Sequence, residues 1–227
     1  MDANYRTQLI STLKLIRDQH LSKNSKLTLV LCGSVASFMI NKVVKSKALY
    51  GRVHLSIHLK PFKLDQSKLF FPGRSASEIL QAQLLVGGIP TYLKLLASKP
   101  SVFPSIQELA FEEHGYFTTE FDKIFISQFG SSSNYEELVR LLGEHPYGLT
   151  RQQIINRSHF SNGGKLTSAL KDLEVAGIIS SYSPFHLGAK TKAKIFIVSD
   201  PYIRLYLSFI EKALPQIADG KPNIFVN

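Results

Sequence analysis

The chain has 227 residues, 44% of them hydrophobic, and 27 Lys and Arg against 17 Asp and Glu, which gives a net charge of +10. This length and apolar content allow one large domain or two to three small ones with hydrophobic cores. The single cysteine, Cys32, excludes a disulfide framework. With no apolar run of 18 residues and no basic-then-apolar leader, we expect a cytoplasmic protein without a membrane helix.

The first 62 residues predict part of an α/β unit. Residues 3–20 have the three-to-four spacing of an amphipathic helix. Residues 27–31, LTLVL, are typical of a strand buried on both faces, and a helix-like segment follows the CGS turn, up to about residue 44. Apolar side chains alternate over residues 53–59 and predict a second strand, which a proline ends. In open α/β sheets ligands lie beyond the carboxyl ends of such strands, which is where Ser34 follows the first one.

Residues 63–130 predict a set of helices. A helix begins at Ser75, three residues before Glu78, in a pattern typical of a capping box. Gly87-Gly88 interrupts the pattern, and Pro90 stands at a favourable position early in the next helix. An acidic helical stretch follows over residues 106–125, with a break near Gly115, and the GSSS sequence at 130–133 is the clearest linker in the chain.

Residues 131–199 predict a winged helix-turn-helix. The pattern indicates helices at 134–145, from a Thr150 cap to 158, and at 164–176, and then strands at 178–182 and 194–198. Three helices followed by a two-stranded ribbon are the elements of that fold, in its order. Residues 200–227 predict a final aromatic helix and a tail.

The third of these helices and the ribbon are candidates for binding nucleic acid. Residues 150–227 carry 10 basic and 5 acidic side chains, whereas residues 101–149 carry 2 and 8. Lysines suit phosphate contacts, which give affinity rather than sequence specificity. The candidate residues are Lys165, Thr167, Ser168 and Lys171 on the helix and Lys190, Lys192 and Lys194 on the wing. The alternative is a protein-interaction module whose third helix packs on the preceding helices.

Short motifs in a fixed order resemble a known family. They are CGS after a strand, LYGR before the next strand, LKPF, GGIPTYL, the winged helix and DPYIRLYLSFI. From about residue 5 to 212 the chain resembles the AAA+/STAND-type ATPases of archaea and bacteria that carry a C-terminal winged helix. The resemblance implies a partial nucleotide-binding α/β sheet in residues 1–62, a helical lid in 63–130, and the winged helix in 131–199.

The sequence departs from this family in its nucleotide chemistry. The family's phosphate loop, GxxxxGK[ST], cradles phosphates, and its acidic strand holds Mg²⁺. Neither motif occurs in this sequence, where GGKLT at 163–167 lacks the glycine spacing and the Lys-Ser/Thr pair. The chain therefore resembles a truncated ATPase region that starts after the phosphate loop and the acidic strand. We expect ATP to bind weakly or only with a partner chain.

The resemblance implies four residues on the nucleotide side, each with a structural alternative. Ser34 matches a polar sensor at a strand end, or it caps the following helix. Arg52 matches a residue that meets phosphate, or it pairs with an acidic side chain of 108–122. Gly88 and Pro90 match a turn near the adenine, or they only join two lid helices.

Three functional hypotheses follow. The chain is a DNA- or protein-binding module without hydrolysis of its own, a subunit of an ATPase completed in trans by a phosphate-loop polypeptide, or a decayed fragment. Self-association through the incomplete sheet is a further expectation, because unpaired strands invite pairing with another chain. The seven histidines are scattered and no Cys/His cluster predicts a metal site. No complete catalytic site is predicted.

Overall fold

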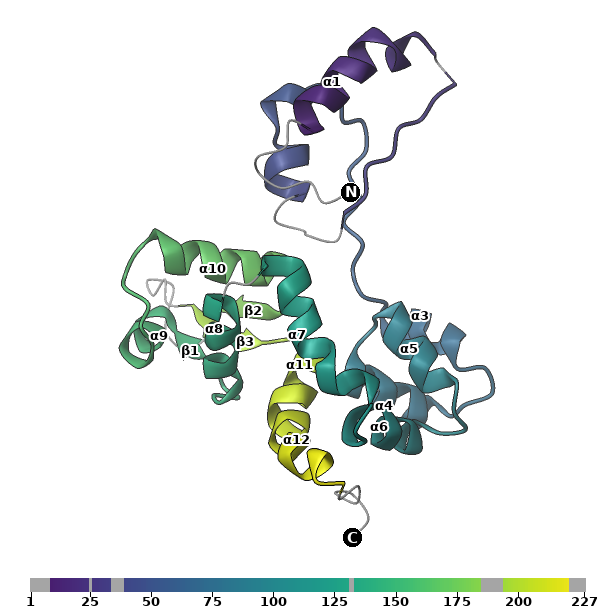
Figure 1. The fold of residues 1–227 in the computed structure, drawn as a ribbon, viewed down its shortest axis with the longest axis vertical. Helices are drawn as coiled ribbons and strands as arrows, with labels where there is room; N and C mark the ends of the chain where they lie inside the picture. Colours follow the sequence, from purple (N-terminus) through teal and green to yellow (C-terminus); the bar gives the residue numbers. More distant parts are fainter. Residues whose placement is uncertain (1–8, 25, 34–38, 131–132, 185–193, 221–227) are drawn as a thin grey trace. The chain divides into compact units, whose positions relative to one another are not determined.

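The computed structural model describes residues 9–24, 26–33, 39–130, 133–184 and 194–220. The chain divides into two compact units, Met1–Leu59 and Lys60–Asn227, which are described separately (Figure 1). In the described residues the structure is mostly helical and has one three-stranded antiparallel sheet. None of the helices described has both the length and the apolar character needed to cross a membrane.

The first unit is built around one amphipathic helix. This helix, α1 (Leu9–Gln19), confirms the predicted helix over residues 9–19, while residues 3–8 of that prediction lie outside the described residues. It contacts two short 3₁₀ turns, η1 (Leu21–Lys23) and η3 (Lys47–Leu49). A π-helical turn, η2 (Met39–Val44), lies within the second predicted helix. Val43 and Leu49 are buried in this unit.

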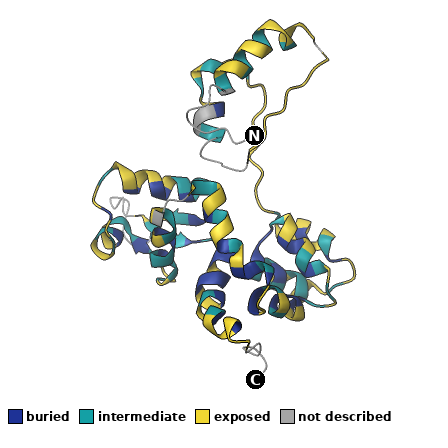
Figure 2. Cartoon of the chain, viewed as in Figure 1, coloured by how far each residue is buried: buried dark blue, intermediate teal, exposed yellow. Residues whose placement is uncertain are grey.

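The two strands predicted in the first unit are absent from the structure. Residues 27–33 and 53–63 run as irregular chain, and neither segment has a ladder partner among the described residues. Their apolar side chains are exposed instead, with Val30 77% and Leu55 75% exposed. In Figure 2 the irregular chain of this unit is mostly coloured as exposed. A strand forms only where a neighbour pairs with its N–H and C=O groups. The partial nucleotide-binding sheet predicted in residues 1–62 is therefore not observed in the described residues, where the one sheet is antiparallel and lies in residues 149–198.

The second unit begins with a series of helices. The elements are α3 (Leu64–Ser67), η4 (Lys68–Phe70), α4 (Ala76–Val86), α5 (Pro90–Ala97), α6 (Val102–Phe111) and α7 (Tyr116–Phe129). Of these, α4, α5 and α7 begin at the predicted boundaries, whereas the short α3 and η4 were not predicted and α6 starts four residues earlier than expected. The break at Gly87-Gly88, the start at Pro90 and the break at Gly115 are all confirmed, and the Ser75 hydroxyl accepts a hydrogen bond from the Glu78 N–H at 3.2 Å.

An aromatic core joins these helices to the C-terminal ones. Tyr202 lies with its ring centroid 5.4 Å from that of Tyr92 and 5.3 Å from that of Phe117, and its hydroxyl donates to the Phe117 carbonyl at 2.9 Å. Phe121 stacks on Tyr206 with centroids 4.4 Å apart. These contacts fix α7 against the last helical stretch, α11 (Pro201–Leu205), η6 (Tyr206–Ile210) and α12 (Glu211–Ala218).

Between α7 and α11 the chain forms three helices and the sheet. The predicted elements of 134–198 are confirmed within a residue or two as α8 (Ser133–Gly143), α9 (Arg151–Arg157), α10 (Gly164–Val175), β2 (Ile179–Tyr182) and β3 (Ile195–Val198). A further strand, β1 (Leu149–Thr150), pairs with β3, so the order in the sheet is β1-β3-β2. Two residues are too few to show a strand pattern, which is why β1 was not predicted.

Apolar side chains from each of these elements form one core. Leu138 and Leu142 of α8, Ile154 of α9, and Leu166, Leu170 and Leu173 of α10 are buried together with Ile179 and Phe196 of the sheet. The chain approaches the sheet through Gly148, where φ is +80° and an added Cβ would lie 2.4 Å from Ile197 Cγ2. A glycine is required there both by the backbone conformation and by the space available.

Candidate nucleic-acid interface

The polar face of α10 is open to solvent. Lys165, Thr167, Ser168 and Lys171, the four helix residues predicted from the sequence, are all exposed. Leu166, Leu170 and Leu173 hold the opposite face of the helix in the core. With 3.6 residues per turn, Thr167, Ser168 and Lys171 point away from that apolar face, and Lys165 lies on its flank.

The turn before α10 is tied to the start of α9 by one arginine. Arg151 donates from Nη2 to the Gly163 carbonyl at 3.0 Å and from Nε to Asn162 Oδ1 at 3.4 Å. Gly163 is the N-cap residue of α10, and its carbonyl also accepts from the Thr167 N–H and hydroxyl. The Thr150 side chain caps α9 reciprocally with Gln153. The ends of α9 and α10 are therefore joined by side-chain hydrogen bonds as well as by packing.

Of the predicted wing, the structure describes only the two strands on either side, β2 and β3. Lys190 and Lys192 lie outside the described residues, whereas Lys194 is exposed and directly precedes β3. The next residue, Ile195, pairs with Thr150 on one side and with Tyr182 on the other. Lys194 therefore stands at the end of the sheet where α9 begins, close in register to Arg151.

Sequence reasoning missed Arg151 and the two tyrosines near the sheet. The Tyr182 hydroxyl donates to the Tyr147 carbonyl at 3.1 Å, and the Tyr147 side chain is 89% exposed. A signal for Arg151 was present: helix first turns favour acidic residues, and α9 has an arginine directly after its Thr150 cap. The tyrosine contact joins residues 35 positions apart and leaves no local pattern.

A second surface of this region is acidic. Glu136 and Glu137 of α8 and Glu144, which directly follows this helix, line a depression of about 390 Å³ together with Arg140 and Arg157. Arg140 forms an ion pair with Glu211 of α12, and His159 Nδ1 lies 2.7 Å from Glu137 Oε1. Because these carboxylates would repel a phosphate backbone, α8 is a poor surface for a polyanion.

Arg52 does not have a free guanidinium. It binds Asp18 of α1 through two hydrogen bonds, Nε to Oδ1 at 2.9 Å and Nη2 to Oδ2 at 2.8 Å, and these lower the pKa of the Asp18 carboxyl. Its partner is therefore Asp18, not an acidic side chain of 108–122. A role in meeting phosphate would require this bidentate pair to open.

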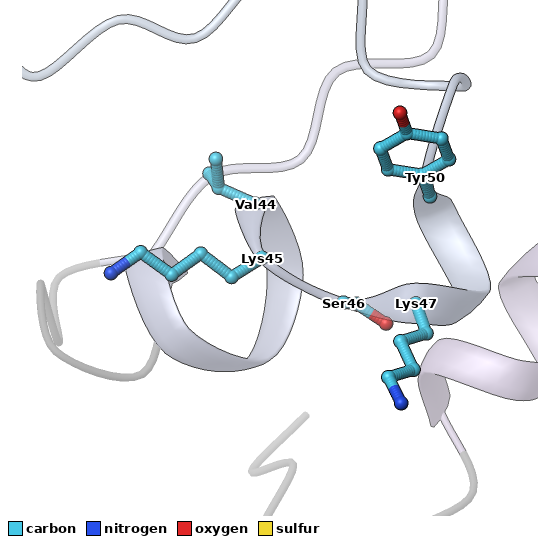
Figure 3. Close-up of a pocket in the computed structure, with 5 residues that line it drawn as sticks. All are labelled: Val44, Lys45, Ser46, Lys47 and Tyr50. Atoms are coloured by element: carbon cyan, nitrogen blue, oxygen red, sulfur yellow. The ribbon is translucent and has the colours of Figure 1, made fainter.

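Close to Arg52 lies a shallow pocket of about 270 Å³ (Figure 3). Val44, Lys45, Ser46, Lys47 and Tyr50 line it, and Arg52 Nη1 donates to the Tyr50 carbonyl at 3.2 Å. Figure 3 shows the side chains of Lys45 and Lys47 pointing in different directions, so they form no converging cradle for an anion. Ser34, the predicted sensor, lies outside the described residues.

Gly88 and Pro90 stand at a structural junction. The Gly88 carbonyl accepts from the Phe62 N–H at 2.8 Å, and Gln83 Nε2 donates to the Phe62 carbonyl at 3.0 Å. Pro90 is the first residue of α5. The two residues join α4 to α5 and hold residue 62 against the turn between them, which is the structural alternative considered for them.

The described residues contain no group of three or more His, Cys, Asp and Glu side chains that could hold a metal ion. Cys32, the lone cysteine, is a free and exposed thiol.

No family model and no solved structure matches the chain. The chain is similar to an uncharacterized protein of Methanocaldococcus jannaschii, with 28% identity over 215 residues, which are 93% of this chain and 47% of that protein. The chain thus spans about half the length of the curated relative it matches. A match of this extent includes most of both units, so the relative has counterparts of the two in one polypeptide.

Proposed function

We propose that this chain binds duplex DNA through a winged helix formed by residues 133–198, as part of an AAA+/STAND-type ATP-binding protein, and has no ATP hydrolysis of its own. The observation that supports DNA binding is the polar, lysine-bearing face of α10, which is exposed while the opposite face is anchored in the core. An α-helix presented in this way fits the major groove of DNA.

The composition of this face favours DNA over a protein partner. The centre of a protein interface is usually apolar and depleted of charged residues. On α10, by contrast, the outward positions hold Thr167, Ser168 and Lys171, and the large apolar residues Leu166, Leu170 and Leu173 are buried. Lysine side chains contact phosphates. The hydroxyls of Thr and Ser form hydrogen bonds with phosphates or with base edges. Binding should therefore be weak, tolerant of sequence and strongly dependent on salt.

Titration of a fluorescently labelled duplex of mixed sequence at low salt, read by anisotropy, tests this function. We expect the double variant Lys165→Ala, Lys171→Ala to lose about tenfold or more in affinity, because two phosphate contacts disappear. The matched control, Lys63→Ala with Lys68→Ala, removes the same charge from exposed positions outside the interface and should bind almost as the unchanged chain does. Absence of binding, or equal binding by both double variants, would instead indicate a protein-interaction module.

A second candidate function is a subunit of an ATPase completed by another polypeptide that carries the phosphate loop. The observation that favours it is the exposed apolar chain of residues 27–31 and 53–59 in the first unit, where Leu59 is 83% exposed. An unpaired apolar segment that has the composition of a strand can join a sheet supplied by another chain.

This candidate requires the chain alone to be inactive. The sequence lacks the phosphate-cradling loop and the acidic strand that would hold Mg²⁺. We expect no phosphate release from ATP above background in highly purified protein. Turnover that disappears in an Arg52→Ala variant would contradict both this candidate and the absence of hydrolysis proposed above.

A further inference from the structure

Arg151 occupies a position that the local structure of its own helix does not favour. It is the first residue of α9, where the positive end of the helix dipole disfavours a cation. Neither α9 nor α10 has an acidic residue in its first turn. Thr150 and Gln153 already cap α9. The stability of α9 therefore does not explain an arginine at this position. Its contacts outside α9 indicate a different role.

Those contacts reach the start of α10. The guanidinium donates to the Gly163 carbonyl at 3.0 Å and to Asn162 Oδ1 at 3.4 Å, across 12 and 11 residues of chain. The side chain is half-buried, which favours a defined orientation over free movement in solvent. Because Gly163 is the N-cap residue of α10, these two bonds hold the N-terminal end of that helix, where Lys165 begins the candidate interface.

The backbone of Arg151 is equally close to the wing. Thr150, its neighbour in sequence, pairs with Ile195, and Lys194 directly precedes that residue. Arg151 therefore connects the two parts of the candidate interface: its main chain follows the strand that pairs with the wing, and its side chain holds the turn before α10.

We propose that Arg151 is a positioning residue for nucleic-acid binding, which fixes the N-terminal end of α10, and with it Lys165, for contact with the duplex backbone. The inference rests on the proposed DNA-binding function. Arg151 acts through the two hydrogen bonds of its planar fork and not through its charge alone. A lysine keeps the charge but cannot reproduce the fork.

Three variants of the full chain separate these two modes of action. Arg151→Ala removes charge and fork, Arg151→Lys keeps the charge, and Arg157→Ala removes an exposed arginine from the other end of α9 as a matched control. Duplex affinity is measured by anisotropy at low salt. Amide hydrogen exchange at the start of α10, including Thr167, is measured in the free protein.

If Arg151 positions α10, Arg151→Ala and Arg151→Lys both lose about fivefold to tenfold in duplex affinity and exchange faster at the start of α10, whereas Arg157→Ala changes neither. Full binding by Arg151→Lys, or unchanged exchange in both Arg151 variants, overturns the positioning role while leaving DNA binding in place. If the unchanged chain does not bind duplex at all, the proposed function itself fails, and the role of Arg151 in binding fails with it.

Discussion

At Gly88 the chain has no room for a side chain. A Cβ added there would lie 1.9 Å from the Phe62 carbonyl oxygen and 2.5 Å from its nitrogen, and both are backbone atoms that cannot turn aside. The same approach allows the hydrogen bond from the Phe62 N–H to the Gly88 carbonyl. Packing against residue 62 is thus a sufficient reason for a glycine at position 88, whether or not a nucleotide ever binds near it.

We therefore expect Gly88→Ala to lower the free energy of unfolding by about 2 kcal/mol or more, because the backbone at residue 62 must move and lose its hydrogen bond. Urea unfolding monitored by circular dichroism measures the change. Gly164→Ala is the matched control, since an added Cβ at that position meets no atom within 4 Å and φ is not positive. Equal stability of the two variants would contradict the close approach described here.

Asp200 also has a structural role, and its side chain titrates. Its carboxylate accepts a hydrogen bond from the Ile203 N–H at 2.8 Å and caps α11. Burial raises the pKa of Asp200 to about 6, although the backbone hydrogen bonds act in the opposite direction. Because the folded-state pKa is above the unfolded value of 3.8, protonation stabilises the fold. This contribution is complete below about pH 4 and is lost as the pH rises through 6.

Asp200→Asn should remove this pH dependence, because asparagine caps a helix about as well as aspartate and carries no charge. We expect the variant to be more stable than the unchanged chain at pH 7 by on the order of 2 kcal/mol, and the difference to shrink toward pH 4.5. Denaturant unfolding at a series of pH values measures it. A difference that is constant from pH 4.5 to 7 would show that Asp200 does not titrate as described.

At the scale of elements, the sequence predicts helices best where residues close in sequence determine their boundaries and their buried face. The Ser75 and Thr150 caps place the starts of α4 and α9, and the apolar periodicity of α10 gives its exposed face correctly. The candidate residues on α10 could therefore be predicted from the sequence. The link from Arg151 to Gly163 and the pair of Arg52 with Asp18 could not, because they join residues 12 and 34 positions apart through tertiary contact.

The strands predicted at 27–31 and 53–59 were wrong for the same reason. Their composition is typical of strands, but a strand also needs a neighbour, and strand preference depends on that context. The described residues supply none. In β2 and β3, by contrast, four residues of each strand pair in register, from Ile179 with Val198 to Tyr182 with Ile195.

Amide hydrogen exchange should show this difference directly. We expect amides of residues 27–31 and 53–59 to exchange within the shortest labelling times, because no ladder bonds protect them, and those of β2 and β3 to exchange slowly. If the first unit pairs with a second copy, protection of 53–59 will increase with protein concentration. Concentration-independent protection equal to that of β3 would mean that these residues form a strand within the chain after all.

At the scale of the whole molecule, charge is distributed unevenly along the sequence. Residues 1–100 carry 15 basic and 4 acidic side chains, residues 101–149 carry 2 and 8, and residues 150–227 carry 10 and 5. A polyanion is therefore attracted by the N-terminal part of the chain as well as by the candidate interface. An experiment on DNA binding must distinguish contacts at α10 and the wing from this general attraction.

The dependence of duplex affinity on salt is the measurement that tests DNA binding through α10 and the wing most directly. Each phosphate contact contributes about 0.9 to the slope of log K against log salt concentration. Replacing Lys165, Lys171 and Lys194 by alanine should reduce that slope by up to about 3, whereas replacing Lys63, Lys68 and Lys94, which are also exposed, should leave it nearly unchanged. Equal slopes for the two triple variants, or no binding to duplex at low salt, would contradict the account.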